Sequence, residues 1–470
     1  MKLKRLWMMA ATLCCGLASV MMTTSCYDNQ DNPAAAPDDP QGEDGKEKAR
    51  LTIVYYGTIG DENDEVAEDM WRKAQEALKG HPDVRMTVCW KYAKPGQYFS
   101  GKYGQPGDLV MFELTDTTDL DRIGENYGQH KPGQAMFDEQ LLTEYLNFAA
   151  EKAPAENYCL WLFGHGAGFD VVTDYEKDLR KPTMQNQTRG VLYDEWFPLT
   201  GNISESDALN MYELLRGIIY SKIPRFQLLV FYDCLMGNLE SLCDLYMLSD
   251  YMAVSEFALP MDNNPAELFF KALTQNKDVE AGMSEALDNI SEDWDEFCAE
   301  LGTGDFKLLK CSEMEGLFEP SARLTARLHE LYPTMREQLD TAVVRTFQTF
   351  NSLEFYDYAD YVHKVAELTG DAQLQAISAE IDEVFNRLII SRHEVHKSRY
   401  GDIPRFTLSV VLKGQESYEK TTQWGYTFAE AYEYTNWSLF TGWGDWLKTN
   451  QQQPKDQKEE WFGQPVGQMY

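Results

Sequence analysis

Two short apolar runs, each ending in a glycine-bearing turn, constrain this chain more than any other feature. Leu160–Phe163 runs into Gly-His165-Gly-Ala-Gly, and Leu228–Tyr232 runs into Asp-Cys234-Leu-Met-Gly-Asn. A buried strand that stops at such a turn holds its last side chains at the edge of a sheet, where α/β folds build their sites. We therefore predict that His165 and Cys234 meet at one edge as proton carrier and nucleophile.

Apolar segments alternate with helical segments through the first half of the chain. Strands are expected at 50–56, 84–90, 108–113 and 251–255 besides the two above, with helices over 65–79, 138–152, 204–221 and from Leu235 onward. This alternation predicts an α/β fold with a mostly parallel sheet covered on both faces. The rest is expected to be mainly helical, with helices over 313–343 and 371–392, then a strand and an aromatic-rich tail.

The first residues have the pattern of an export signal. Met1–Arg5 is positively charged, Leu6–Met22 is a short apolar stretch, and Thr23–Cys26 ends it with small residues before a cysteine. We predict a lipoprotein signal over residues 1–26, with Cys26 lipidated, and hence a cell-envelope lipoprotein at the outer membrane or cell surface. The alternative is an ordinary signal peptide cut nearby, which would leave the protein periplasmic or secreted.

Residues 27–48 carry almost no apolar side chain. Such a segment cannot bury enough surface to offset its chain entropy, so we predict a disordered tether. From Ala49 the composition is globular, and about 420 residues are more than one simple core usually holds. One large domain or two coupled domains are therefore expected.

Charge limits the classes of partner. The chain has 42 basic and 76 acidic residues, and loss of the basic leader would make its net charge of −34 more negative. Nucleic acid is not an expected partner, because binding it depends on a basic face that neutralises phosphates. The acidity indicates either a solvated surface or attraction of cationic peptides and divalent cations.

Cysteine and histidine spacing indicates no built-in metal centre. Of nine cysteines, two fall in the leader and one at the lipidation site, and no C-x-x-C pair suggests structural zinc. His393 and His396 have H-x-x-H spacing on an expected helix, which is more typical of a solvated face. The run Asp61-Glu62-Asn63-Asp64 is a candidate for calcium, although such a run more often begins a helix.

Four segments, in order and spacing, resemble the clostripain-like cysteine peptidases, relatives of caspases and gingipains. They are the first strand with its loop to Asp64, Phe163–Phe169, Tyr232–Glu240 and Ala253–Pro260, and weaker similarity continues at 353–359, 406–412 and 437–447. The resemblance implies a caspase-like three-layer α/β/α sandwich with a catalytic domain over 49–285. It also implies that 286–470 forms a mainly helical region that packs on the sheet and completes the fold.

The resemblance also implies roles for the two turns. Cys234 would attack a peptide carbonyl, and His165 would protonate the leaving amine and later help activate water. Backbone N–H groups of Gly166 and Cys234 would hold the oxyanion, because a residue without Cβ lets the carbonyl approach the main chain. A helix that starts just after Cys234 would favour the thiolate.

The residues that would bind substrate depart from the family pattern. In the family, an aspartate two residues before the cysteine forms the floor of a pocket for Arg or Lys, but this chain has Tyr232 there and Asp233 beside the cysteine. Neighbouring strand residues point to opposite faces, so Asp233 does not simply take over. Asp262 matches a second acidic position and could still select a basic side chain. Ser255 and Glu256 are further candidates for substrate binding.

Together these observations predict an exported, lipid-anchored cysteine endopeptidase that acts on proteins or peptides, with an Arg/Lys preference at P1 and no required cofactor. Calcium dependence occurs in some relatives. Members of the family cut themselves between the two catalytic strands, and the basic residues of that stretch are candidate sites: Lys177, Arg180, Lys181 and Arg189. The alternative is a caspase-fold lipoprotein that binds peptide or glycan without cutting, which the Tyr232-Asp233 pair and the 11 tryptophans would support.

Overall fold

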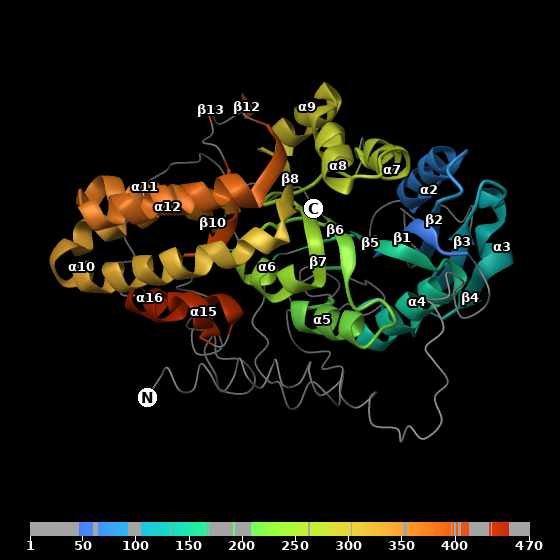
Figure 1. Cartoon of the computed structure of the whole chain (residues 1–470), viewed down its shortest axis with the longest axis horizontal. Coiled ribbons are helices and arrows are strands. Elements are labelled where there is room, and N and C mark those ends of the chain that lie inside the picture. The colour runs from blue at the N-terminus through green and yellow to red at the C-terminus, as the bar shows by residue number, and fades with distance from the viewer. Residues whose placement is uncertain are drawn as a thin grey trace, which may run out of the picture. The chain divides into compact units, whose positions relative to one another are not determined.

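The computed structural model divides into a unit of residues 1–45 and a unit of residues 46–470. All described residues belong to the second unit (Figure 1). They are 47–59, 64–92, 105–131, 133–166, 168, 191–192, 208–261, 264–301, 303–350, 355–395, 397–398, 401–402, 406–412, 432–433 and 435–450. Residues 1–46, with the expected leader, Cys26 and nearly all of the expected tether, therefore lie outside the description. Among the described residues, no helix is long and apolar enough to cross a membrane.

A mixed sheet forms the centre of the second unit, and the described strands follow the order β11-β8-β7-β6-β5-β1-β2-β3-β4 (Figure 1). The strands from β7 to β2 in this order are parallel, whereas β3, β4, β8 and β11 are antiparallel to their neighbours. The bounds are β1 Ala49–Thr58, β2 Val84–Lys91, β3 Asp108–Leu114, β4 Gly128–His130, β5 Ala155–Phe163, β6 Phe226–Tyr232, β7 Ser249–Val254, β8 Asp305–Lys310 and β11 Ile389–Glu394.

Helices cover both faces of this sheet, as predicted. Strand β1 is buried at every position except Arg50, because both of its faces pack against helices. One face carries α2 (Glu65–Leu78), α7 (Ala266–Gln275), α8 (Val279–Asp288) and α9 (Glu292–Leu301), and the other carries α4 (Glu139–Lys152), α5 (Met211–Ile219) and α6 (Leu239–Leu245) (Figure 1). The short elements are η1 (Leu120–Arg122), α3 (Ile123–Tyr127) and η3 (Tyr246–Leu248). The three-layer α/β/α prediction is confirmed.

The second half of the chain is mainly helical and also contributes strands. Its helices are η4 (Cys311–Leu317), α10 (Phe318–Arg345), α11 (Tyr358–Thr369), α12 (Ala372–Leu388), α15 (Asn436–Thr441) and α16 (Trp443–Asn450). Small sheets join β9 (Gln348–Phe350), β10 (Phe355–Asp357) and β14 (Ser409–Val411), and β12 (Lys397–Ser398) with β13 (Gly401–Asp402). Strands β8 and β11 extend the central sheet, so this region shares one core with the first half.

Some expected element boundaries were wrong. The helix expected over 371–392 ends at Leu388, and residues 389–394 form β11, which pairs with β8. His393 therefore lies on a strand rather than a helix, with its Nε2 2.6 Å from Asp295 Oδ1. Residues Ile389 and Ile390 are β-branched and favour a strand over one more helical turn. The helix expected over 204–221 is observed at 211–219 and is fixed by a capping box between Asn210 and Glu213.

Candidate active site

Strands β5 and β6 are direct neighbours in the sheet and run parallel. Their register pairs Phe163 with Tyr232, the last residue of each strand. His165 and Cys234 each lie two residues beyond this pair, at the carboxyl edge of the sheet, and both are half-buried. The sheet thus places side by side the two residues that the sequence singled out.

Contact between the two turns is closest at Gly166. A Cβ atom at this position would lie 3.0 Å from the backbone nitrogen of Cys234 and closer still to its carbonyl oxygen. The backbone after His165 therefore packs directly on the backbone of Cys234. Only glycine permits this approach without displacing one of the turns.

A short strand-like pairing holds the histidine turn from its other side. The N–H of Leu192 donates to the carbonyl oxygen of His165 at 2.9 Å, and Gly166 pairs with Val191 in an antiparallel bridge. Val191 in turn exchanges backbone hydrogen bonds with Leu209, just before α5. The position of His165 therefore depends on residues far from it in sequence.

The thiol of Cys234 lies among backbone N–H donors. The N–H of Leu259 donates to its Sγ at 3.3 Å. Burial raises the pKa of Cys234 to about 11 and Asp233 adds to the rise, while hydrogen bonds from the N–H groups of Leu259, Gly166 and Cys234 itself act against it. The resting thiol is therefore protonated at neutral pH, in a setting where several N–H groups converge on one point.

The residue after the cysteine has an unusual backbone conformation. Leu235 has a φ of 65°, in the left-handed region, and its N–H donates to the carbonyl oxygen of Phe257 at 3.0 Å. Helix α6 begins only at Leu239, with Asn238 as its N-cap. The expected helix directly after Cys234 was therefore placed four residues too early, because the chain first makes a left-handed turn. Such a conformation costs roughly 1–3 kcal/mol and is typical of functional sites.

Tyr232 and Asp233 are both fully buried. The Tyr232 ring stacks on Phe163 with centroids 5.7 Å apart, and its hydroxyl donates to the carbonyl oxygen of Pro260 at 2.8 Å. The Cβ of Asp233 lies against Gly166. Burial raises the pKa of the Asp233 carboxyl well above its usual range. Neither side chain offers an exposed negative charge to a substrate.

Ser255 and Glu256 are likewise buried, and each has a side-chain partner within the protein. The Ser255 hydroxyl donates to Asp305 Oδ1 at 2.8 Å, and Glu256 pairs with Lys307 at 2.9 Å. Lys307 also pairs with Asp305, and all these side chains are buried. Burial raises the pKa of Glu256 to about 8. These residues support the cysteine turn from behind, because the carbonyl of Ser255 accepts the N–H of Gly237 at 2.6 Å.

Residues from the second half of the chain complete this support, and sequence reasoning did not find them. The N–H of Ser409 donates to the carbonyl of Gly237 at 2.9 Å, and the N–H of Val411 donates to Glu240 Oε1 at 2.8 Å. Asp305 and Lys307 were also missed. Two charged residues alternating with apolar ones in a buried strand could have signalled an internal ion pair.

Several sequence-predicted residues lie outside the described part of the chain: Asp262, Lys177, Arg180, Lys181, Arg189, Asp61, Glu62 and Asn63. Asp64 is described, and it is a buried residue whose Oδ1 accepts the indole N–H of Trp90 at 3.1 Å. Within the described ranges, no group of three or more His, Cys, Asp or Glu side chains could hold a metal ion.

Comparison with known proteins agrees with this fold. A sequence model of the clostripain family matches residues 110–448. The fold resembles a secreted C11 cysteine protease from Bacteroides thetaiotaomicron named iotapain, with a TM-score of 0.58 at 16% identity over 84% of this chain and 99% of that chain. It also resembles an inactive zymogen C11 protease from Parabacteroides distasonis, with a TM-score of 0.56 at 15% identity and the same coverage. No curated protein sequence matches the chain significantly.

Proposed function

The chain belongs to the clostripain family of cysteine peptidases, and we propose that Cys234 and His165 form its catalytic dyad. The observation that carries this proposal is the register of β5 and β6, which brings both residues to one edge, with Gly166 packed on the cysteine backbone. In this proposal the protein is an endopeptidase, and its substrates are proteins or peptides.

The raised pKa of Cys234 sets the order of proton transfers. Because the resting thiol is protonated, His165 first accepts the thiol proton as the sulfur attacks the scissile carbonyl carbon. His165 then gives this proton to the leaving amine as the C–N bond breaks and a thioester remains. A water molecule, deprotonated by His165, attacks the thioester, and the proton returns to the sulfur as the acid leaves.

The oxyanion would be held by the backbone donors around the sulfur. The N–H groups of Gly166 and Cys234 both reach the thiol, so an oxygen bonded to the attacked carbon would fall within their range. The N–H of Leu259 already donates to Sγ and would stabilise the thiolate as it forms. Removing one oxyanion donor typically costs about 10²–10³ in kcat.

The proposed preference for Arg or Lys at P1 would depend on Asp262. The Tyr232 hydroxyl donates to Pro260 and its ring stacks on Phe163. Asp233 lies buried against the histidine turn, so neither residue offers a negative charge to the P1 side chain. Asp262 follows the Pro260 segment that Tyr232 holds in place. Its carboxylate would then be the charge that selects a basic side chain.

Export and membrane attachment are also proposals. The leader pattern ending at Cys26 supports a lipid-anchored protein of the cell envelope. The similar protein from Bacteroides thetaiotaomicron is described as secreted, which supports export of this chain. The relative from Parabacteroides distasonis is described as a zymogen, which supports self-cleavage at Lys177, Arg180, Lys181 or Arg189. The dyad needs no cofactor, and calcium at residues 61–64 would act on stability or activation rather than on the chemical steps.

A peptide library and a covalent probe test the dyad together. Wild type should cleave the library and should be labelled at Cys234 by peptidyl acyloxymethyl ketones, whereas Cys234→Ala should do neither. Cys311→Ala, which removes a buried thiol at the opposite edge of the sheet, is the matched control and should behave as wild type. Cleavage that survives in Cys234→Ala would refute the dyad.

A further inference from the structure

The parallel strands give the sheet two distinct edges. Ala49 pairs with Ala155, and Phe226 pairs with Ser249, so β1, β5, β6 and β7 all begin at one edge, which we call the amino edge. Cys234 and His165 follow the ends of β6 and β5, at the opposite edge. Whatever binds the amino edge therefore lies on the far side of the sheet from the dyad.

Two exposed apolar side chains lie at the amino edge. Tyr220 is 71% exposed and Met247 is 53% exposed, the two highest values among the large hydrophobic side chains of the described residues. Tyr220 lies in the loop that leads to β6, and Met247 lies just before β7. Arg225 connects the two loops, because its guanidinium donates to the carbonyl of Met247. These two exposures, and the hydrogen bond that joins the loops, distinguish this edge from the rest of the described surface.

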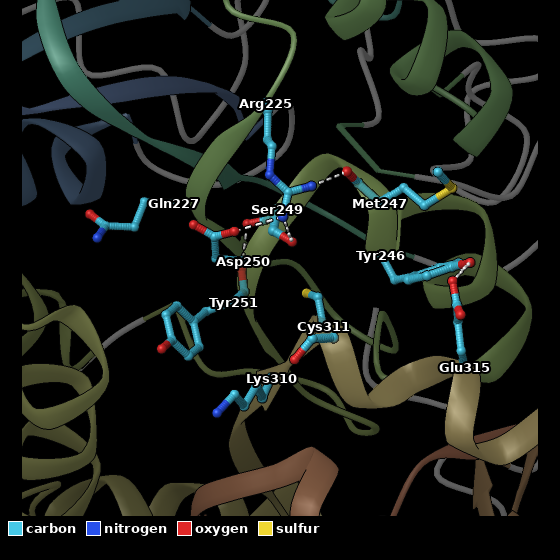
Figure 2. A pocket seen from close by; sticks show the side chains of 11 residues that line it. Arg225, Gln227, Tyr246, Met247, Ser249, Asp250, Tyr251, Lys310, Cys311 and Glu315 are labelled. Carbon is cyan, nitrogen blue, oxygen red and sulfur yellow. Dashed lines mark hydrogen bonds and ion pairs between the residues drawn. The ribbon is translucent and has the colours of Figure 1, made fainter. Parts of the chain in front are cut away.

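A pocket of about 490 Å³ opens beside Met247 (Figure 2). Its lining combines Arg225, Tyr246 and Tyr251 with Lys310, the last residue of β8. Figure 2 shows Arg225 turned toward Asp250 and Ser249, while Lys310 extends away from that pair. The backbone of Lys310 pairs with Tyr251, whereas its side chain has no hydrogen-bond or ion-pair partner among the described residues. Tyrosine, methionine and long basic side chains are the types that suit a bilayer interface, where apolar atoms meet phosphates.

The position of β1 connects this edge to the proposed anchor. Glu47, the first described residue, lies two positions before the start of β1 at the amino edge. A lipid on Cys26 would therefore be joined to this edge through residues 27–46, and a random coil of 20 residues has a typical end-to-end distance of about 25 Å. Such a short tether gives an effective concentration in the millimolar range, so a weak surface contact is sufficient.

We propose that the amino edge rests on a lipid bilayer, with Tyr220 and Met247 at the interface and Lys310 near lipid phosphates. The dyad then faces away from the membrane, toward large substrates. Lys222 and Arg225 lie on the same surface but are paired with Glu151 at 2.8 Å and Asp250 at 2.6 Å. The contact is therefore weak without the anchor, and the proposal rests on the lipid attachment proposed above.

Hydrogen–deuterium exchange on vesicles of phosphatidylcholine and phosphatidylglycerol tests this surface. One sample is the full chain purified from membranes. Mass spectrometry of its Cys26 peptide shows whether acyl groups are attached. A second is the full chain with Cys26→Ser and an amino-terminal histidine tag, held on the same vesicles by a nickel-chelating lipid. In both, exchange in 219–225 and 246–249 should slow about fivefold relative to detergent, with no change in 255–261.

The two proposals fail in different ways in this design. An unacylated Cys26 with slowed exchange in the tagged sample would refute the anchor and leave the surface standing. Unchanged exchange in 219–225 and 246–249 of the tagged sample, or slowed exchange at 255–261, would overturn the surface. Tyr220→Ser with Met247→Ser should abolish the slowing and leave hydrolysis of a soluble peptide at the wild-type rate. Leu439→Ser, at an exposed apolar side chain on α15 away from the amino edge, is the control and should retain the slowing.

Discussion

A Cβ atom on Gly166 would lie 2.4 Å from the carbonyl oxygen of Cys234. It would also lie 2.9 Å from the Cβ of Asp233, and real Cβ atoms do not approach other atoms so closely. The histidine turn and the cysteine turn therefore meet backbone to backbone, with no space for a side chain between them. The geometry of the proposed dyad depends on this one glycine.

Gly166→Ala should therefore reduce activity far more than it reduces stability. The methyl group would push the two turns apart, and a misplacement of about 1 Å can cost about 10²-fold in rate. We expect kcat/KM for a peptide substrate to fall by at least that factor. Gly133→Ala is the control, because its Cβ would meet nothing within 4 Å, and it should keep wild-type activity. Equal activities of the two variants would contradict the packing.

Alkylation of Cys234 should increase steeply with pH. A pKa of about 11 leaves about 10⁻⁴ of the thiol ionised at pH 7, and the thiolate fraction grows tenfold per pH unit below the pKa. Labelling by iodoacetamide, quantified on the Cys234 peptide by mass spectrometry, should therefore rise about 1000-fold between pH 7 and pH 10. A labelling rate that becomes constant above pH 8 would contradict this prediction, because it would show that the pKa of Cys234 lies well below 11.

Much of the fold and the place of the dyad could be predicted from sequence, because both depend on local patterns. A continuous apolar run such as Leu228–Tyr232 identifies a strand buried on both faces, and glycines beside His165 mark the turn that ends another. The alternation of strands and helices then requires a parallel sheet. In such a sheet, residues that follow two neighbouring strands meet at one edge.

The support of the site could not be predicted, because it depends on contacts between residues distant in sequence. Lys307 pairs with Glu256 from the neighbouring strand β8, which sequence patterns did not reveal. The N–H of Val411 donates to Glu240, which lies 171 positions away in the sequence. No sequence pattern predicts the left-handed turn at Leu235, because leucine rarely adopts this conformation. The expected substrate roles of Ser255 and Glu256 likewise depended on knowing which way their side chains point.

Lys307→Met should strongly destabilise the protein. The change leaves Glu256 and Asp305 buried without their cation, and removing one partner of a buried pair typically costs about 3–5 kcal/mol. Urea denaturation followed by tryptophan fluorescence would measure this loss. Lys310→Met, three residues further along the same strand and outside any described ion pair, should change the free energy of unfolding by less than about 0.5 kcal/mol. A small effect at both positions would contradict a structural role for the network.

Asp233→Asn should stabilise the protein at neutral and alkaline pH. Burial raises the pKa of Asp233 in the folded state above its unfolded value. Its contribution to stability is therefore fully present below the unfolded pKa, near pH 4, and is lost as the pH rises toward the folded pKa. Asparagine does not ionise, so the melting temperature of the variant minus that of wild type should increase from pH 4.5 to pH 8.5. A difference that stays flat with pH would show that Asp233 ionises as easily in the folded protein as in the unfolded chain.

Asp262→Asn should remove any preference for basic residues at P1. Tyr232 and Asp233 are fully buried, so a carboxylate at 262 is the charge left to attract Arg or Lys. A desolvated charge partner is worth about 10²-fold or more in selectivity. We expect kcat/KM for Arg and Lys substrates to fall by that factor, while substrates with an uncharged P1 residue keep their rate. Tyr232→Phe, which removes only the hydroxyl that donates to Pro260, is the matched control and should keep the preference. A wild-type enzyme that prefers uncharged P1 residues would contradict this role of Asp262. It would show instead that Tyr232, which stands where the family has an aspartate, changed the specificity of the pocket.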